Sequence, residues 1–279
     1  MEPEPDPPAA PGQETLGSDP QAMEVSSANT ITVLSARGGS GKTFLATNLG
    51  VALARRRGET AVLVDLNLEF GGVALALNIR HGATMLEAAH AVERGISDLD
   101  LDATLALHSS GLRLVSAMRQ PGDSELLADG AMSGVIERLR QIYDYVILDA
   151  RPSFRGYMLD LWESSDTMLV TCTPDVPAVI LTSLLLDAFR MVNLSREEVV
   201  VVLNEVYPKT MPTASQVQKS LDVKVHRVPY GGQQVTRAVD LGQVLVEVLP
   251  KHVTSLAIFK LAEFLATRRR RTDAAVSVR

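Results

Sequence analysis

The segment TITVLSARGGSGKT, residues 30–43, decides the fold because it joins a β-strand to a helix through a glycine-rich loop. Residues 30–35 form the β-branched apolar run of a buried strand, and Lys42 opens a stretch with helical periodicity. In such a strand–loop–helix unit, backbone N–H groups and the N-terminus of the helix converge on one point and favour an anion there. The segment therefore predicts a phosphate-binding loop.

The residue types in this loop suit that chemistry. Gly38, Gly39 and Gly41 allow the main chain to close around phosphate oxygens or to take positive φ, which a side chain would prevent. Lys42 is expected to reach the β- and γ-phosphates of a nucleotide, and the Thr43 hydroxyl to ligate Mg²⁺. The alternative is a glycine-rich turn that only links a strand to a helix.

Outward from the loop, short β-branched runs alternate with longer stretches of helical period, as in parallel strands joined by crossover helices. We predict an α/β domain over residues 30–267, with a mostly parallel central sheet of about seven or eight strands and helices on both faces. The expected strands are 30–35, 60–65, 112–117, 145–149, 167–172, 199–203 and 224–228. The expected helices are 42–57, 84–94, 124–143, 179–192, 212–221, 233–241 and 253–267.

Charge and proline separate the first 29 residues from this domain. They hold six acidic residues, no basic residue and six of the 14 prolines, which predicts a disordered acidic tail. The remaining residues carry 27 acids and 27 bases, so the net charge of −6 belongs to the tail. A balanced body argues against a surface coated with nucleic acid. With no secretory signal and no run of about 18 apolar residues, a cytoplasmic protein is expected.

A single cysteine, Cys172, limits the redox chemistry open to the chain. Its place in an apolar run predicts a buried thiol in a strand. One cysteine excludes a disulfide within the chain, and it excludes an iron–sulfur cluster held by this chain's cysteines alone.

The run from Arg37 to Thr43 resembles the deviant phosphate-binding loop of the ParA/MinD ATPases, whose pattern is Lys-Gly-Gly-x-Gly-Lys-Thr/Ser, with Arg37 at the signature lysine. Residues 62–71 are similar to that family's second strand and first switch, and residues 143–149 to the strand that ends in its Mg²⁺-associated aspartate. Residues 165–175, 202–204 and 228–230 follow in the family's order. Within the superfamily, residues 69–77 and 110–114 most resemble the ATPase domain of the CpaE/TadZ branch, which is associated with pilus assembly.

This resemblance implies ATP and Mg²⁺ as cofactors, in a homodimer that holds the nucleotide between two subunits. It implies that Arg37 crosses to the partner's phosphates, and that the metal is served by Thr43, Asp65 and Asp149, with Asp65 also organising the first switch. The nucleotide is expected against Arg37, Gly38, Gly39, Ser40, Gly41, Lys42, Thr43, Phe44, Asn204, Pro229 and Tyr230, with the Asn204 amide at the adenine. As alternatives, Arg37 is a solvated loop charge in a monomer, and Asn204 caps a turn or a helix.

Departures from the family pattern bear on hydrolysis. Asn67 stands where relatives carry a second aspartate that orients the attacking water, and an amide does not accept that water's proton at neutral pH. Gly72 replaces an acid common in CpaE-like sequences, and residues 150–153 lack the glycine usual in the second switch. With Lys42, Asp65, Asn67 and Arg37 as catalytic candidates, we expect tight ATP binding and slow hydrolysis.

The implied function is a nucleotide-switched positioning or assembly factor for a type IV (Tad/Flp-like) pilus or secretion machine, open to recruitment to the inner face of the membrane or a cell pole. The alternatives are a DNA-segregation or membrane-gradient ATPase and a nucleotide-independent dimeric scaffold. The last helix and Arg268–Arg271 offer contact with a membrane or with DNA. A packed helix followed by a disordered, solvated basic tail over residues 268–279 is favoured.

Overall fold

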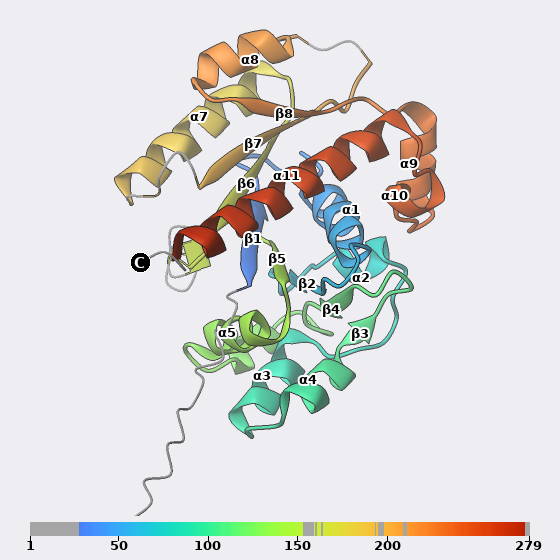
Figure 1. Ribbon diagram of the computed structural model, residues 1–279, viewed down its shortest axis with the longest axis vertical. Helices are drawn as coiled ribbons and strands as arrows, with labels where there is room; N and C mark the ends of the chain where they lie inside the picture. The colour runs from blue at the N-terminus through green and yellow to red at the C-terminus, as the bar shows by residue number, and fades with distance from the viewer. Residues whose placement is uncertain are drawn as a thin grey trace, which may run out of the picture.

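The computed structural model describes residues 28–152, 159, 161–162, 164–192, 194, 198–208 and 211–276, with the backbone alone for residues 269–276. The expected acidic tail therefore lies almost entirely outside the described residues. The described chain forms a three-layer α/β fold in which one sheet separates two layers of helices (Figure 1). The predicted fold class is confirmed.

Eight strands form the sheet, in the order β3-β4-β2-β5-β1-β6-β7-β8. Every neighbouring pair is parallel except the antiparallel pair of β3 and β4 at one edge. The strands are β1 (Asn29–Leu34), β2 (Ala61–Asp65), β3 (Ala106–Leu107), β4 (Arg113–Val115), β5 (Tyr145–Asp149), β6 (Thr167–Cys172), β7 (Val199–Asn204) and β8 (Val225–Val228). All seven predicted strands are present, two of them with the predicted bounds, and only the two-residue β3 was not expected.

Strand β1 lies between β5 and β6, so the chain leaves it toward β2 on one side and later crosses to β6 on the other. In open α/β sheets, ligands bind outside the carboxyl ends of the strands at such a reversal of strand order. The predicted phosphate loop follows β1 directly and therefore lies at this point.

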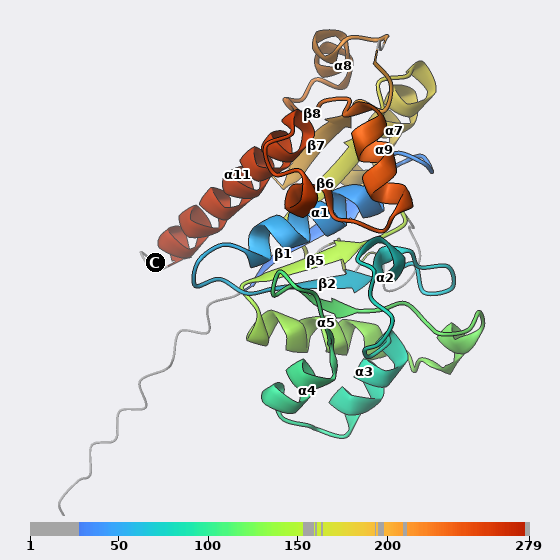
Figure 2. The same cartoon turned by 90° about the vertical axis from the view of Figure 1, so that its right-hand side faces the viewer.

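Helices cover both faces of the sheet (Figure 2). Two separate apolar clusters, one on each face, make up the core. The first face carries α1 (Lys42–Ala54), α2 (Val73–Ala76), α10 (Leu245–Val248) and α11 (Val253–Val276), with α9 (Gly232–Asp240) next to α10. The second carries α3 (Met85–Glu93), α4 (Asp98–Thr104), α5 (Ala131–Ile142), α7 (Val176–Met191) and α8 (Ala214–Leu221).

The single helix predicted over residues 124–143 is wrong. A short 3-10 helix, η1 (Asp123–Leu126), comes first, and α5 begins only at Ala131. Gly130 lies between them with a φ of 78°, a left-handed conformation that a continuous helix does not contain. The helices α2, α4 and α10, of four to seven residues, were not expected.

Helix α11 is longer than predicted because it continues to Val276 and does not end at Thr267. Residues 268–276 contain no glycine or proline and are rich in arginine and alanine, which are good helix formers. The basic segment is thus helical as far as Val276, which corrects the expectation of a disordered tail over those residues.

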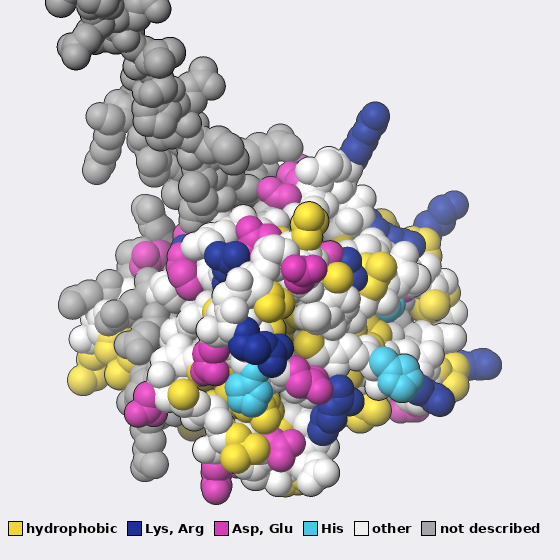
Figure 3. Space-filling view, turned by 90° about the horizontal axis from the view of Figure 1, so that it is seen from below, with side chains coloured by type: hydrophobic (Ala, Val, Ile, Leu, Met, Phe, Trp, Pro, Cys, Tyr) yellow, Lys and Arg dark blue, Asp and Glu magenta, His cyan; other side chains and the backbone are white. Residues whose placement is uncertain are grey.

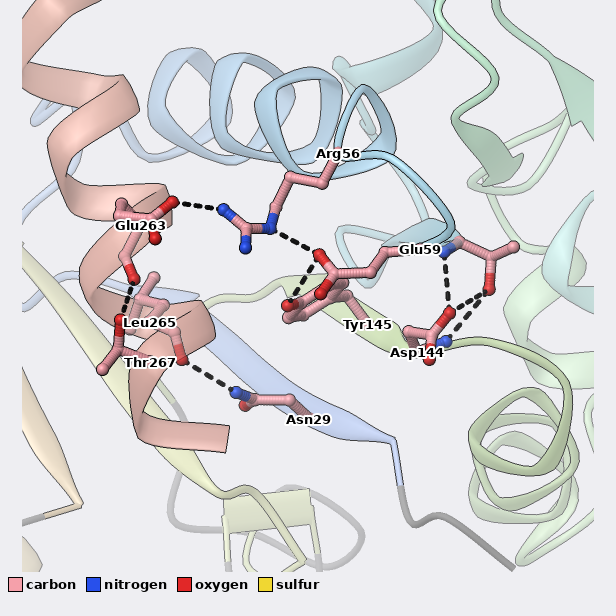
Figure 4. A network of polar contacts seen from close by, with 9 residues as sticks. Asn29, Arg56, Glu59, Asp144, Tyr145, Glu263, Leu265 and Thr267 are labelled. Atoms are coloured by element: carbon pink, nitrogen blue, oxygen red, sulfur yellow. Dashed lines mark hydrogen bonds and ion pairs between the residues drawn. The ribbon is translucent and has the colours of Figure 1, made fainter. Parts of the chain in front are cut away.

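Polar contacts hold α11 against the start of β1 and the end of α1 (Figure 4). Asn29 Nδ2 donates to the carbonyl of Leu265 at 3.3 Å, and Arg56 forms ion pairs with both Glu263 and Glu59. The apolar side of α11, including Ile258, Leu261 and Leu265, is buried. Helix α11 is therefore an integral part of the helical layer on this face of the sheet.

The surface seen from below in Figure 3 carries acidic, basic and apolar side chains interspersed, with neither sign of charge predominating. This one face therefore has the mixture of charges expected for the folded body. Within the described part of the chain, no helix has both the length and the apolar character that a membrane span requires.

Candidate functional site

The loop after β1 has the backbone geometry that its glycines predicted. Gly39 and Gly41 have φ values of 75° and 85°, and α1 begins at Lys42 without a side-chain cap. A Cβ on Gly41 would lie 2.4 Å from the Nδ2 atom of Asn204, while a Cβ on Gly38 or Gly39 would meet nothing within 4 Å. Gly38 and Gly39 thus leave open space over the loop, and Gly41 allows the loop to pack closely against Asn204.

Side chains from three neighbouring strand ends fix the loop. Asn204 Nδ2 donates to the carbonyl of Ser40 at 2.9 Å, and the hydroxyls of Ser40 and Thr171 lie 2.9 Å apart. Ser35 Oγ donates to the carbonyl of Arg37 at 2.6 Å. The Asn204 amide therefore supports the loop, and its expected contact with adenine stays a prediction. Ser35 and Thr171 were not predicted as site residues, because serine and threonine at strand ends carry no distinctive signal.

Lys42 folds back over the loop, with Nζ donating to Ser35 Oγ at 3.2 Å. Burial lowers the pKa of this amine, the nearby carboxylate of Asp149 opposes that shift, and the charge of Arg151 adds to it. An ammonium held beside the loop can neutralise an anion that binds there.

Two carboxylates end adjacent strands beside the loop. Asp65 on β2 and Asp149 on β5 are register partners, so like charges stand next to each other at the carboxyl edge of the sheet. Burial raises the pKa of Asp149 to about 6, and the charge of Asp65 contributes to that rise. Thr43 Oγ1 donates to Asp149 Oδ2 at 2.6 Å, while Asp149 Oδ1 is buried and has no hydrogen-bond partner among the described residues.

Asp65 organises the segment that follows β2. Its two carboxylate oxygens accept hydrogen bonds from the backbone N–H groups of Asn67 and Val73, each at 3.0 Å. A Cβ on Gly71 would lie 2.3 Å from Asp65 Oδ2, so only glycine lets this segment close on the carboxylate. Burial raises the pKa of Asp65, and these N–H donors partly offset that rise.

Two arginines lie at the site, Arg37 at the start of the loop and Arg151 after β5. Arg37 donates from Nη1 to Asp175 Oδ1 at 2.6 Å, and Asp175 also caps α7 by accepting the N–H of Ala178. Arg151, in the exposed segment after β5, donates from Nε to Asn67 Oδ1 at 2.8 Å. Neither Arg151 nor Asp175 was predicted as a site residue, because each contact joins segments that are far apart in the chain.

The remaining predicted residues lie near the loop but not at its centre. Phe44, in the first turn of α1, is half-buried and packs against the apolar cluster beneath α11. Asn204 pairs in register with Val228, so Pro229 and Tyr230 follow beside it. Pro229 accepts a hydrogen bond from Thr254 through its carbonyl, and the Tyr230 side chain is exposed.

These residues fit a phosphate group with Mg²⁺. The loop provides open backbone, Lys42 a cation, Thr43 a hydroxyl and Asp149 a carboxylate oxygen that lacks a hydrogen-bond partner in the described structure. No group of three His, Cys, Asp or Glu side chains suited to a metal occurs among the described residues. Mg²⁺ takes few protein ligands and keeps waters and phosphate oxygens, and Thr43 and Asp149 provide oxygens of that kind.

A parallel α/β sheet with this loop, lysine and pair of strand-end carboxylates defines the P-loop nucleoside triphosphatase fold. A family model described as "AAA domain" matches residues 28–200, and the chain belongs to this family, within the ParA/MinD superfamily.

The chain is 25% identical to the septum site-determining protein MinD of Thermotoga maritima over 223 residues, which cover 77% of this chain and 79% of that protein. Its fold resembles the crystal structure of a ParA family ATPase from Chlorobium tepidum, with a TM-score of 0.77, 21% identity, and coverage of 85% and 98% of the two chains. It also resembles MinD from Pyrococcus horikoshii complexed with Mg-ADP, with a TM-score of 0.65, 20% identity, and coverage of 85% and 96%.

Proposed function

We propose that this chain binds ATP with Mg²⁺ at the loop of residues 37–43 and uses the bound nucleotide as a switch for dimerisation. The observation that carries the proposal is the buried Asp149 Oδ1, which has no hydrogen-bond partner among the described residues and lies beside Thr43. The Mg-ADP complex of Pyrococcus horikoshii MinD, a protein of similar fold, supports the same ligand class.

Each residue has a role in that proposal. Lys42 would neutralise the β- and γ-phosphates, and Thr43 and Asp149 would hold the metal, while Asp65 fixes the segment after β2 through the N–H groups of Asn67 and Val73. When bound, Mg²⁺ neutralises charge on the phosphates. Asn204 fixes the loop, and Phe44, Pro229 and Tyr230 border the nucleotide.

Arg37 serves the dimer in this proposal. Its side chain is 49% exposed and pairs with the 34% exposed Asp175, so the contact is a surface ion pair that contributes at most about 1 kcal/mol. Such a weak contact can be exchanged for a phosphate group of a second subunit, since a guanidinium binds phosphate through a planar fork of donors. The nucleotide would then lie between two copies of the chain.

The cellular role proposed is a positioning or assembly factor for a type IV (Tad/Flp-like) pilus or secretion machine, in the cytoplasm or recruited to the inner face of the membrane or a cell pole. Residues 69–77 and 110–114 support the CpaE/TadZ branch. Asn67 supports slow hydrolysis, because its amide cannot act as a base and its oxygen already accepts from Arg151.

The second candidate is a DNA-segregation or membrane-gradient ATPase. The names of the relatives, a septum site-determining protein and a ParA family ATPase, favour this alternative, as does the basic final part of α11. Co-sedimentation with anionic liposomes and with DNA at two salt concentrations tests it, because electrostatic binding to either weakens steeply as salt rises. Sedimentation with neither would leave a protein partner.

Molar mass in solution tests the switch directly. The native chain is expected to be a monomer without nucleotide and with ADP, and a dimer with ATP and Mg²⁺. Arg37→Ala should still bind ATP but remain a monomer, whereas Arg57→Ala, an exposed arginine beyond the far end of α1, should behave as the native chain. A native dimer in every condition would contradict the switch and favour the nucleotide-independent scaffold.

A further inference from the structure

Arg151 lies beside the phosphate loop, although no sequence motif marks it as a site residue. It follows β5 by two residues and donates from Nε to Asn67 Oδ1 at 2.8 Å. Asn67 follows β2, the strand next to β5, so the contact joins the two segments that leave the carboxylates Asp149 and Asp65. The guanidinium is thereby held at the carboxyl edge of the sheet.

The contact places Arg151 beside the two strand-end carboxylates. Asn67 donates its backbone N–H to Asp65 Oδ1 at 3.0 Å, so the residue that binds Arg151 is itself bound to Asp65. Asp149, the register partner of Asp65, lies two residues before Arg151 in the chain. Arg151 therefore lies at the edge of the sheet where the phosphates are proposed to bind.

The two arginines of the site differ in what holds them. Arg37 is bound by a carboxylate, so its charge is neutralised within the subunit. Arg151 is bound by a neutral amide and, within the part of the chain that the structure describes, forms no ion pair. Its Nε is used by Asn67, which leaves both terminal nitrogens of the fork available for an anion.

We propose that Arg151 is a second phosphate-binding cation of the site, contacting the terminal phosphate of ATP bound to its own subunit, and that Asn67 is the residue that positions it. This inference rests on the proposed ATP binding. An aspartate at position 67 would form an ion pair with Arg151 and cancel its charge, whereas the amide orients the guanidinium and leaves that charge intact. Asn67 thus acts on the phosphate through Arg151.

The test compares affinities for a non-hydrolysable ATP analogue and for ADP, both with Mg²⁺, by titration calorimetry. Arg151→Ala is expected to weaken the analogue about tenfold or more, the effect of one charge-assisted hydrogen bond, and ADP by much less. Arg151→Lys should recover part of the affinity, because the charge returns without the planar fork. Arg138→Ala, which removes an arginine paired with Asp98 away from the site, is the matched control and should change neither affinity.

A variant at position 67 tests whether Asn67 positions the charged guanidinium of Arg151 or only links the two segments. Asn67→Asp should weaken the analogue selectively, since Arg151 is neutralised while the contact between the segments remains. Equal losses for the analogue and ADP in Arg151→Ala, or no loss for either, would overturn the proposal. A native chain that binds neither nucleotide would instead refute ATP binding itself, so the two failures are distinct.

Discussion

Arg37 and Asp175 form an ion pair of 2.6 Å that joins the phosphate loop to the N-cap of α7 within one subunit. Asp175 Oδ1 also accepts the N–H of Ala178, so one carboxylate both caps a helix and binds the arginine proposed to reach a second subunit. The proposed dimerisation through Arg37 would therefore compete with this contact.

The first prediction concerns that competition. Asp175→Asn keeps a side-chain oxygen for the helix cap but removes the charge that holds Arg37. We expect a stability change of less than about 1 kcal/mol and a tighter dimer with ATP and Mg²⁺, measured by light scattering over a range of protein concentrations. Asp187→Asn, which breaks an exposed pair with Arg190 on the same helix, is the control. A weaker dimer would show that Asp175 itself serves the interface.

The second prediction concerns Gly71, which packs against the carboxylate of Asp65. In Gly71→Ala the new Cβ would lie 2.3 Å from both Asp65 Oδ2 and Ala117 Cβ, so the segment must shift away from the carboxylate. We expect a loss of about 1–3 kcal/mol in stability and weaker binding of Mg-ATP, measured by thermal unfolding with and without nucleotide. Gly72→Ala is the matched control, because its Cβ would meet only Thr43 Cγ2, at 4.0 Å. Equal effects of the two substitutions would contradict this account.

The third prediction concerns the stability cost of the buried carboxylate. The folded state raises the pKa of Asp149 from 3.8 to about 6, so it favours the protonated form. The ionised form therefore destabilises the nucleotide-free protein above about pH 6, and this cost disappears as the pH falls toward 3.8. Asp149→Asn should raise the free energy of unfolding at pH 8 by up to about 3 kcal/mol, and by less at pH 5, in urea titrations without nucleotide.

With Mg-ATP present, the native chain should be the more stable of the two proteins at pH 8. The ligand stabilises the native chain, which has the carboxylate, and adds little to the stability of Asp149→Asn. A native chain more stable than Asp149→Asn at pH 8 without nucleotide would show that the carboxylate is better paired than the structure indicates.

The fourth prediction concerns turnover. The native chain should hydrolyse ATP slowly, and Asn67→Asp should raise kcat by about tenfold or more, because a carboxylate can accept a proton from the attacking water. The same change should raise KM, since it neutralises Arg151. Asn67→Ala provides neither base nor tether and should raise KM without raising kcat. Steady-state phosphate release measures both constants, and a native rate already equal to that of Asn67→Asp would rule out the limiting role of Asn67.

The predicted strands agree best with the structure where they are wholly buried. The runs Tyr145–Asp149 and Thr167–Cys172 are apolar or β-branched for nearly their whole length, and the structure has them with the predicted bounds. The predicted elements are wrong where a short length or a single glycine decides the outcome. A two-residue strand such as Ala106–Leu107 has no detectable period, and Gly130 divides a stretch whose apolar spacing suits one helix.

The residues of the site likewise divide into those predicted from the sequence and those that only the structure reveals. Lys42 was predicted because it opens a helix directly after a glycine-rich loop, and Asp65 and Asp149 were predicted because residues 62–71 and 143–149 resemble segments of the ParA/MinD family. The partners Arg151 and Asp175 were missed because their contacts join segments separated by 84 and 138 residues. Only the packed structure brings such residues together.

The hydrogen bond from Asn29 to Leu265 has a practical consequence for experiments on this protein. Both residues lie at the amino edge of the sheet, one length of β1 away from the phosphate loop, which is about 20 Å for six residues. A fluorescent reporter or an immobilisation tag attached beyond either point is joined to the chain at the opposite edge of the sheet from the proposed nucleotide site, so the proposed binding can be measured on labelled protein.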